Sequence, residues 1–234
     1  MNTVNLQGTV VAKEDLRYTE SGLAVQELTL AGYSKIIIPG QFPEVDPNKI
    51  IEIPWYHRVT FLGDAAEKNM YRELGTGLRV KGALNYSTWE SDGKKRSKVN
   101  VKGIFGLPFD ASGQTRTDKA GQDLLVDALN EVSVIGNLTA APELRQTDSG
   151  KSVSNARLAI HDEWTGANGK GEKTHFIDVT LWNAQADQAA FLDKGALVIV
   201  DGRLATDSWE SSEGKRYKTY IEGSSCQVVL PKAA

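Results

Sequence analysis

The chain repeats itself once, and the repeated segments occur in the same order in both halves. Leu16-Arg-Tyr-Thr-Glu-Ser-Gly22 returns as Leu144-Arg-Gln-Thr-Asp-Ser-Gly150, and Trp89-Glu-Ser91 returns as Trp209-Glu-Ser211. Two copies are too few for a solenoid, whereas half of a 234-residue chain matches the usual size of one domain. The repeat therefore predicts a duplicated domain.

The domain boundaries follow from where the repeat stops. Copy one is expected at residues 1–109 and copy two at residues 130–234. The intervening residues 110–129 are rich in Gly, Thr, Asp and Gln, which is typical of a polar connector. Copy one also carries a proline-rich insertion at Ser34–Pro54, which predicts a loop.

Each copy has mainly the sequence pattern of β-strands. In copy two, two early strand candidates are followed by a clear strand at His175–Trp182. Ala184–Leu192 then favours a short helix that Gly195 ends, and two further strands form a hairpin. Five strands with one helix between the third and fourth is the element order of an OB-fold. The predicted fold class is all-β, with two tandem OB-folds, each a five-stranded Greek-key barrel with one short helix.

Strand alternation places large aromatic side chains on the face that does not build the barrel core. In the third strand of copy two, Ile177, Val179 and Leu181 share the inward face, because successive side chains point to opposite faces. Phe176 and Trp182 lie on the other face beside polar residues. These two aromatic side chains are therefore expected to be exposed.

The third strand of copy one shows the same alternation. His57 and Val59 are predicted to face inward, so His57 is interpreted as a packed or interface histidine. Tyr56 and Arg58 are predicted to face outward. The equivalent of Phe176 in copy one is thus another outward aromatic residue.

The fourth strands carry one tryptophan each on the outward face. Trp89 keeps step with Arg79 and Lys81, and Trp209 keeps step with Arg203. Leaving an indole exposed gives up about 1.5–3 kcal/mol of burial. A stacked nucleobase regains roughly 1–3 kcal/mol with little sequence preference. The exposed aromatic residues therefore suggest a surface that stacks the bases of a single strand.

Basic residues accompany these tryptophans on the far sides of their hairpins, where they would contact phosphates. The candidate phosphate-binding residues are Arg17, Arg58, Arg79, Lys81, Lys94, Lys95, Arg96, Lys98, Arg145, Arg203, Lys215, Arg216 and Lys218. The formal net charge is −3, so such a site has to be a local basic stripe on a near-neutral body.

Each feature also has a structural explanation that stays open at this point. Exposed aromatic residues can cover a subunit interface, which would make the chain a protein-interaction module or scaffold. A basic cluster can be a solvated turn, and Arg17 or Arg145 can bridge to a carboxylate. Trp164, in the loop expected after the second strand of copy two, is a further candidate for stacking.

No catalytic or metal-binding pattern is found in the sequence. Gly150-Lys-Ser152 lacks the first glycine of a phosphate loop, because Arg145 stands at that place. Three histidines and one cysteine do not form a zinc pattern. Asp178 and Asp187 are interpreted as surface acids. We therefore expect no enzyme, no cofactor and no metal.

Composition gives a broad class only. Hydrophobic content of 40% with 24% charged residues is typical of a folded domain. Apolar stretches such as Ala196–Val200 are too short to span a membrane, and no secretory signal is seen. A lone cysteine, Cys226, suits a reducing cytoplasm.

Taken together, these motifs resemble those of bacterial single-stranded DNA-binding protein, in the two-domain form of the Deinococcus–Thermus lineage. The resemblance rests on the Leu-Arg-x-Thr-x-Ser-Gly segments, on Trp55-Tyr-His-Arg-Val59, on His175–Trp182 and on the two Trp-Glu hairpins. It implies binding and protection of single-stranded DNA in replication, recombination and repair, in the cytoplasm at the nucleoid. It also implies a homodimer with four OB-folds. The positions that match the family's stacking residues are Tyr56, Trp89, Trp164, Phe176, Trp182 and Trp209.

Two departures from the family pattern qualify that expectation. Leu62 stands where the family tends to have an aromatic residue, so less stacking is expected in copy one. The sequence ends at Leu230-Pro-Lys-Ala-Ala234 without the acidic tail through which the family recruits replication and repair proteins. Recruitment of replication and repair proteins through a tail is therefore left open by this sequence.

Overall fold

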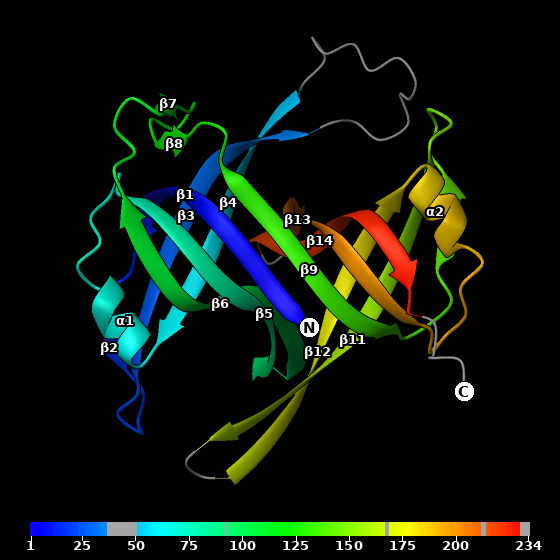
Figure 1. The fold of residues 1–234 in the computed structure, drawn as a ribbon, viewed down its shortest axis with the longest axis horizontal. Helices are drawn as coiled ribbons and strands as arrows, with labels where there is room; N and C mark the ends of the chain where they lie inside the picture. The colour runs from blue at the N-terminus through cyan, green and yellow to red at the C-terminus, as the bar shows by residue number, and fades with distance from the viewer. Residues whose placement is uncertain (37–50, 92, 167–168, 212–213, 230–234) are drawn as a thin grey trace.

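The computed structural model describes residues 1–36, 51–91, 93–166, 169–211 and 214–229 (Figure 1). Copy one contains β1 (Asn2–Lys13), β2 (Arg17–Tyr18), β3 (Ala24–Ile36), β4 (Ile51–Leu62), α1 (Asp64–Asn69), β5 (Gly77–Ser91) and β6 (Lys94–Phe109). The connector contains β7 (Thr115–Thr117) and β8 (Asp123–Leu125). Copy two contains β9 (Leu129–Leu138), β10 (Glu143–Gln146), β11 (Ser152–Gly166), β12 (Gly169–Trp182), α2 (Ala184–Ala189), β13 (Leu197–Ser211) and β14 (Gly214–Val228).

Each copy closes into a five-stranded barrel. In copy one, β1 pairs with β3 and β5, β3 pairs with β4, β5 pairs with β6, and a parallel contact between β4 and β6 closes the ring. In copy two, β9, β11, β12, β14 and β13 close in the same way. One short helix lies between the third and fourth barrel strands of each copy. The predicted fold class is confirmed.

The two barrels share one continuous sheet. β1 and β9 pair antiparallel from Asn2 opposite Val134 to Gln7 opposite Leu129, and they run side by side through the centre of the molecule (Figure 1). Backbone hydrogen bonds therefore hold copy one and copy two together along six residue pairs.

Side-chain alternation fills each barrel as predicted. Ile177, Val179 and Leu181 are buried in copy two, and Val59 and Phe61 are buried in copy one. These side chains contribute about 1.5–3 kcal/mol each by leaving water. Their outward neighbours on β4 and β12 are thereby held on the opposite face.

The connector differs from the polar segment that the sequence predicts. Leu124 and Leu125 are buried, and Leu125 lies opposite Gly32 at a parallel bridge to β3. A Cβ at Gly32 would come within 2.2 Å of the Ala128 Cβ, so this close approach requires glycine. Two adjacent leucines thus dock an otherwise polar segment onto the first barrel.

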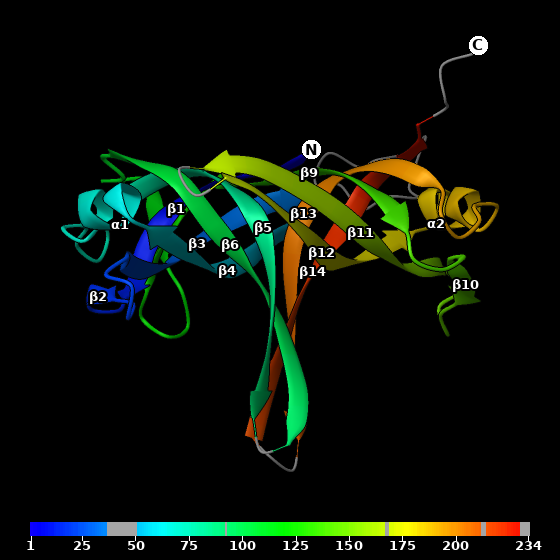
Figure 2. The same cartoon turned by 90° about the horizontal axis from the view of Figure 1, so that it is seen from below.

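Two long hairpins project from the same side of the molecule. The β5–β6 and β13–β14 hairpins extend together away from the barrels and contact each other through β6 and β14 (Figure 2). A third hairpin, β11–β12, extends in another direction (Figure 1). Of the expected loop at Ser34–Pro54, the ends belong to β3 and β4, and residues 37–50 lie outside the described residues. Across the described part of the chain, no helix has the length and apolar character needed to cross a membrane.

Candidate nucleic-acid interface

A groove of about 650 Å³ lies between the two barrels at the base of the paired hairpins. Both copies contribute to its walls, although the residues are far apart in sequence. The aromatic and charged residues that line it are Tyr56, His57, Arg58, Tyr86, Lys98, Arg157, Phe176, Asp178, Trp209, Tyr217 and Lys218. The groove thus combines exposed rings with cations.

Of the six candidate stacking residues, Trp182 is half-buried, contrary to its predicted exposure, whereas the other five are exposed: Tyr56, Trp89, Trp164, Phe176 and Trp209. Trp89 is 42% exposed and Trp209 is 48% exposed, so neither indole is covered by the rest of the chain. Phe176 packs edge-on against Tyr86, with ring centroids 5.7 Å apart and an interplanar angle of 82°. This contact leaves part of the Phe176 surface exposed to the groove.

Tyr56 occupies the copy-one position equivalent to Phe176, but the connector anchors it. Its hydroxyl donates a hydrogen bond to the carboxylate of Asp118, in the turn between β7 and β8. The cation of Arg116 lies 4.1 Å from the centroid of the nearby Tyr33 ring and pairs with Glu52 at 2.5 Å. The connector therefore contacts aromatic side chains on β3 and β4 of copy one.

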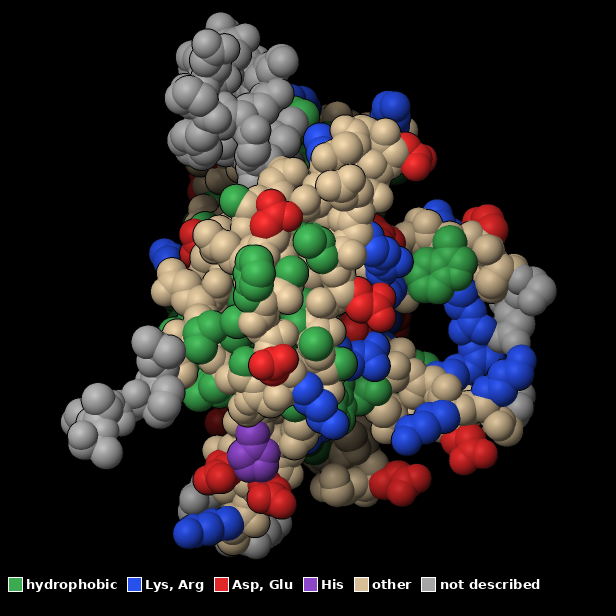
Figure 3. All heavy atoms as spheres, turned by 90° about the vertical axis from the view of Figure 1, so that its right-hand side faces the viewer, with side chains coloured by type: hydrophobic (Ala, Val, Ile, Leu, Met, Phe, Trp, Pro, Cys, Tyr) green, Lys and Arg blue, Asp and Glu red, His purple; other side chains and the backbone are tan. Residues whose placement is uncertain are grey.

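Each hairpin places a basic residue directly across from its tryptophan. Trp89 on β5 lies opposite Arg96 on β6, and Trp209 on β13 lies opposite Arg216 on β14. Lys and Arg side chains gather around a large hydrophobic side chain on the part that projects to the right in Figure 3. In this arrangement the ring can stack on a base of a single nucleic-acid strand while the cation binds a neighbouring phosphate.

Asp178 on β12 lies in the groove between two cations. Its carboxylate accepts hydrogen bonds from Arg157 Nε at 2.7 Å and Arg157 Nη2 at 3.1 Å, and Lys218 Nζ lies 2.9 Å away. Burial acts to raise the pKa of Asp178, but the hydrogen bonds from Arg157 and Lys218 outweigh it and leave this pKa lowered. The sequence suggests that Asp178 is a simple surface acid. In the structure it is ionised and paired with Arg157 and Lys218.

Arg58 and Arg17 share a carboxylate in copy one. Arg58 lies 3.7 Å from Glu27 and 3.9 Å from Glu14, and Arg17 lies 3.6 Å from Glu27. The bridge from Arg17 matches the structural alternative raised for that residue. Arg58 also lines the groove, so its side chain can reach either the carboxylates or a bound phosphate.

His57 lies at the contact between the barrels, as one of the two interpretations of its inward position predicts. Its Nε2 is 3.2 Å from the carbonyl oxygen of Leu204 and 3.2 Å from Asn130 Nδ2. Asn130 also hydrogen-bonds both backbone groups of Leu204 at 2.9 Å. Burial lowers the pKa of His57 to about 4, so the imidazole is neutral near pH 7.

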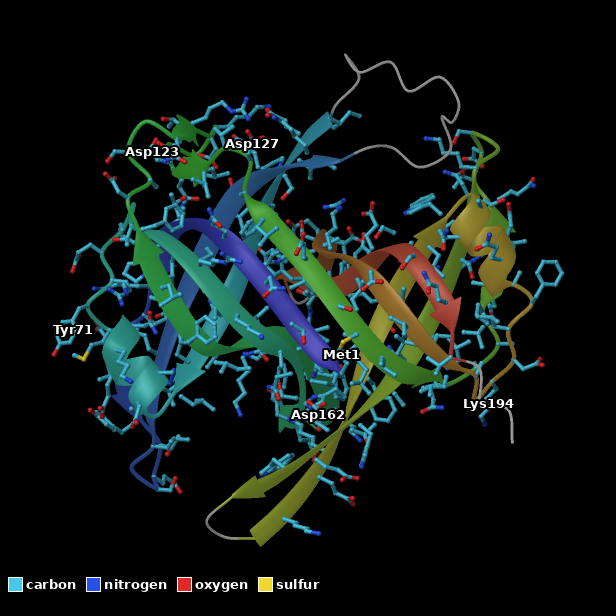
Figure 4. All side chains as sticks on the ribbon, in the orientation of Figure 1. Met1, Tyr71, Asp123, Asp127, Asp162 and Lys194 are labelled. Atoms are coloured by element: carbon cyan, nitrogen blue, oxygen red, sulfur yellow. The ribbon has the colours of Figure 1, made fainter. Side chains whose placement is uncertain are left out.

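A second group of polar contacts joins the barrels near the N-terminus. Asn2 Nδ2 donates to Asp162 at 3.0 Å, and Asp162 lies 3.3 Å from His175 Nε2. The backbone N–H of Tyr86 donates to His175 Nδ1 at 3.0 Å. Figure 4 shows Asp162 close to Met1 at the centre of the molecule. The hydrogen bonds of Asn2 with Asp162 and of Tyr86 with His175 therefore join the two copies, which sequence analysis does not reveal.

The predicted site residues fall into three groups. Those that line the groove are Tyr56, Arg58, Lys98, Phe176, Trp209 and Lys218. Those on the projecting hairpins outside it are Trp89, Lys94, Lys95, Arg96, Lys215 and Arg216. The remaining residues lie elsewhere: Arg17, Arg79, Lys81, Arg145, Trp164, Trp182 and Arg203.

Several members of the third group have contacts or positions that the sequence does not predict. Arg203 pairs with Glu222 at 2.7 Å, and its side chain is only 16% exposed. Arg79 and Lys81 lie where β5 pairs with β1. Trp164 lies in β11 rather than in a loop, because the strand continues as far as Gly166 and the ring lies across Gly171. Roles for these residues in binding stay predictions.

Among the aromatic and charged residues that line the groove, the sequence-based set of site residues lacks His57, Tyr86, Arg157, Asp178 and Tyr217. Alternation around the buried Leu158 signals that Arg157 points outward. Its value as a groove residue depends on pairing with Asp178, which the sequence does not specify. Among the described residues, no group of three His, Cys, Asp or Glu side chains is placed to hold a metal ion.

Comparison with known proteins identifies the family of this fold and groove. The model of the single-strand binding protein family matches residues 1–103 and again residues 129–229. The chain belongs to the single-strand binding protein family. Both barrels thus match the family separately.

Relatives in this family match nearly the whole chain. The chain is 42% identical over 227 residues to the single-stranded DNA-binding protein of Thermus thermophilus, covering 95% of this chain and 81% of that protein. It is 36% identical over 234 residues to that of Deinococcus radiodurans, covering 98% and 75%. The crystal structure of the wild-type protein from Thermus aquaticus superposes with a TM-score of 0.77 at 34% identity, covering 100% of this chain and 95% of that one. The two-domain resemblance is confirmed.

Proposed function

We propose that the chain binds single-stranded DNA without sequence preference and without catalysis. Bases stack on the exposed aromatic side chains, and Lys and Arg side chains hold the phosphates. The observation that carries this proposal is the groove in which Tyr56, Phe176 and Trp209 lie among the cations Arg58 and Lys218. Family membership supports the same ligand.

The physiological role that follows is coating and protection of single strands in replication, recombination and repair, at the nucleoid in the cytoplasm. An alternative role, in which the aromatic residues are only a protein interface, predicts that DNA leaves their fluorescence unchanged. The groove favours DNA because its rings lie beside cations from both copies, whereas the core of a protein interface is depleted in charge.

We also propose that two chains associate into a homodimer with four OB-folds. The apolar side chains of Ile104, Phe105 and Leu107 are exposed on β6 of copy one. The equivalent stretch of copy two begins with Ser224 and Ser225. Exposed apolar side chains grouped on one strand support association with a second copy. Molecular mass in solution tests this proposal.

We further propose that the chain consists of an N-terminal OB-fold at residues 1–109, a connector at 110–129 and a C-terminal OB-fold at 130–234. The docking of Leu125 against β3 supports counting the connector with copy one during folding. Limited proteolysis tests this division. The polar turns of residues 110–123 are expected to be cleaved earlier than either barrel.

The test of DNA binding is a titration with oligo-dT of varied length, followed by tryptophan fluorescence. Stacking on Trp209 and Trp89 is expected to quench the emission strongly, and affinity is expected to fall as salt rises because bound phosphates release counter-ions. Circular dichroism of the same samples shows that the protein is folded. Unaltered emission at low salt from folded protein would overturn the proposal.

A further inference from the structure

The copy-two wall of the groove holds a carboxylate, that of Asp178, where a DNA binder is expected to present positive charge. Asp178 is only 22% exposed, while the side chains of Arg157 and Lys218 are 54% and 52% exposed. Arg157 binds Asp178 through two nitrogens from the neighbouring strand β11, and Lys218 approaches from β14. The carboxylate of Asp178 thus pairs with two exposed cations of the groove.

The internal repeat provides a matched comparison for this triad. In copy one, Arg58 stands at the position of Asp178, and its partner across β3 is Thr29, where copy two has Arg157. Lys98 stands at the position of Lys218. All three copy-one residues line the same groove. The strand positions are therefore the same, but only copy two carries an acid among its groove cations.

The difference in geometry is as clear as the difference in charge. The nearest carboxylate oxygens lie 3.7 Å and 3.9 Å from Arg58, whereas those of Asp178 lie 2.7 Å from Arg157 and 2.9 Å from Lys218. Shorter, charge-assisted hydrogen bonds are the stronger ones. The copy-two cations are therefore held more firmly than Arg58.

We propose that Asp178 is an internal counter-ion: its carboxylate pairs with Arg157 and Lys218, and a DNA phosphate displaces it from these two cations. This inference rests on the proposed function and names a residue that tunes it. The carboxylate is tethered beside the cations, so an incoming phosphate has to exchange with it rather than bind free charges. Stacking on the adjacent Phe176 and Trp209 favours that exchange, because both rings line the same groove. Asp178 therefore weakens phosphate binding in the groove, and base stacking offsets part of that loss.

The decisive variant is Asp178→Asn, which keeps the shape of the side chain and removes its charge. Exposed ion pairs are weak, so release of two cations is expected to raise oligo-dT affinity roughly threefold to tenfold at low salt. The plot of log affinity against log salt is expected to steepen by about 0.7 for each extra phosphate neutralised. Fluorescence titration across a salt series measures both quantities.

Asp193→Asn is the matched control, because it makes the same change in net charge at an exposed position after α2, outside the groove. Its affinity is expected to stay close to that of the wild-type protein. Arg157→Gln, made alone and with Asp178→Asn, tests the mechanism further. The gain from Asp178→Asn is expected to shrink when Arg157 is absent, because one of the released cations is missing.

The outcomes separate this inference from the proposed function. If folded wild-type protein binds oligo-dT and folded Asp178→Asn binds equally or more weakly, the counter-ion proposal is wrong and DNA binding stands. If neither protein binds, both proposals are overturned. Higher affinity that appears equally in Asp193→Asn also overturns the counter-ion proposal, because net charge alone then explains it. Thermal unfolding of each variant confirms that the proteins compared are folded.

Discussion

Copy one and copy two build the same barrel but present different side chains to the groove that they share. Tyr56 and Arg58 of copy one correspond to Phe176 and Asp178 of copy two, and the barrel closes identically around them. Inward positions such as Val59 and Val179 keep their apolar character because the barrel requires close packing, although the inward His57 of copy one stands where copy two has Ile177. Outward positions carry no such constraint, so the two copies differ there in hydroxyl groups and in charge. The difference shows that a duplicated fold leaves its binding face free to diverge.

The largest expected effect is on oligo-dT affinity, and it should differ between the two hairpin tryptophans. Trp209 lines the groove, whereas Trp89 lies on its hairpin outside it. Trp209→Ala is expected to weaken oligo-dT binding about tenfold to a hundredfold, because it removes a stacked base. Trp89→Ala serves as the matched variant and is expected to have a smaller effect with short oligonucleotides. Equal losses for both variants would show that the groove is not the primary site.

The next effect is on the pH dependence of stability, and it concerns His57, whose copy-two counterpart is Ile177. Burial lowers the pKa of His57 to about 4, below an unfolded value of 6.5, so the unfolded chain binds a proton more readily. Stability from this group is therefore present above pH 6.5 and is lost as the pH falls toward 4. The loss is of the order of 2 kcal/mol between pH 7 and pH 5.

His57→Ile makes copy one resemble copy two at this position. Urea unfolding at pH 7 and pH 5 is expected to show less loss of stability for the variant than for the wild-type protein. A residual pH dependence is expected from His175, because its pKa is also lowered, mainly by burial. An unchanged difference between the two pH values would mean that the pKa of His57 in the folded protein is close to its value in the unfolded chain.

The smallest effect compares Arg58 with Asp178. Arg58→Gln removes a groove cation that copy one holds only loosely, so affinity for oligo-dT is expected to fall about threefold to fivefold. The salt dependence is expected to become shallower by about 0.7. This change is opposite in sign to that expected for Asp178→Asn. Fluorescence titrations of both variants in one salt series check the comparison, and changes of the same sign would contradict it.

Strand alternation and the repeat were sufficient to predict the barrels and the exposure of Tyr56 and Phe176, although Trp182, assigned to the same face as Phe176, is half-buried. Ile177 and Phe176 could be assigned to opposite faces because the alternation is a local property of a strand. The docking of Leu124 and Leu125 could not be predicted in the same way, since it depends on the space left beside Gly32 on β3.

The groove itself was outside the reach of sequence analysis. Its two walls come together only because β1 pairs with β9, a contact between segments that are distant in the chain. The sequence also does not show which cations are paired. Arg157 pairs with Asp178 and Arg203 pairs with Glu222, and both pairings depend on the folded structure. Whether a basic residue is available to a ligand depends on neighbours that only the folded chain provides.

The antiparallel pairing of β1 with β9 has a consequence for how the protein behaves when it is scarce. Both walls of the groove belong to one polypeptide, so their mutual effective concentration is set by the fold and does not fall on dilution. A single chain at nanomolar levels still presents a complete groove. Affinity for short oligonucleotides should therefore be independent of protein concentration, even where association between chains is lost.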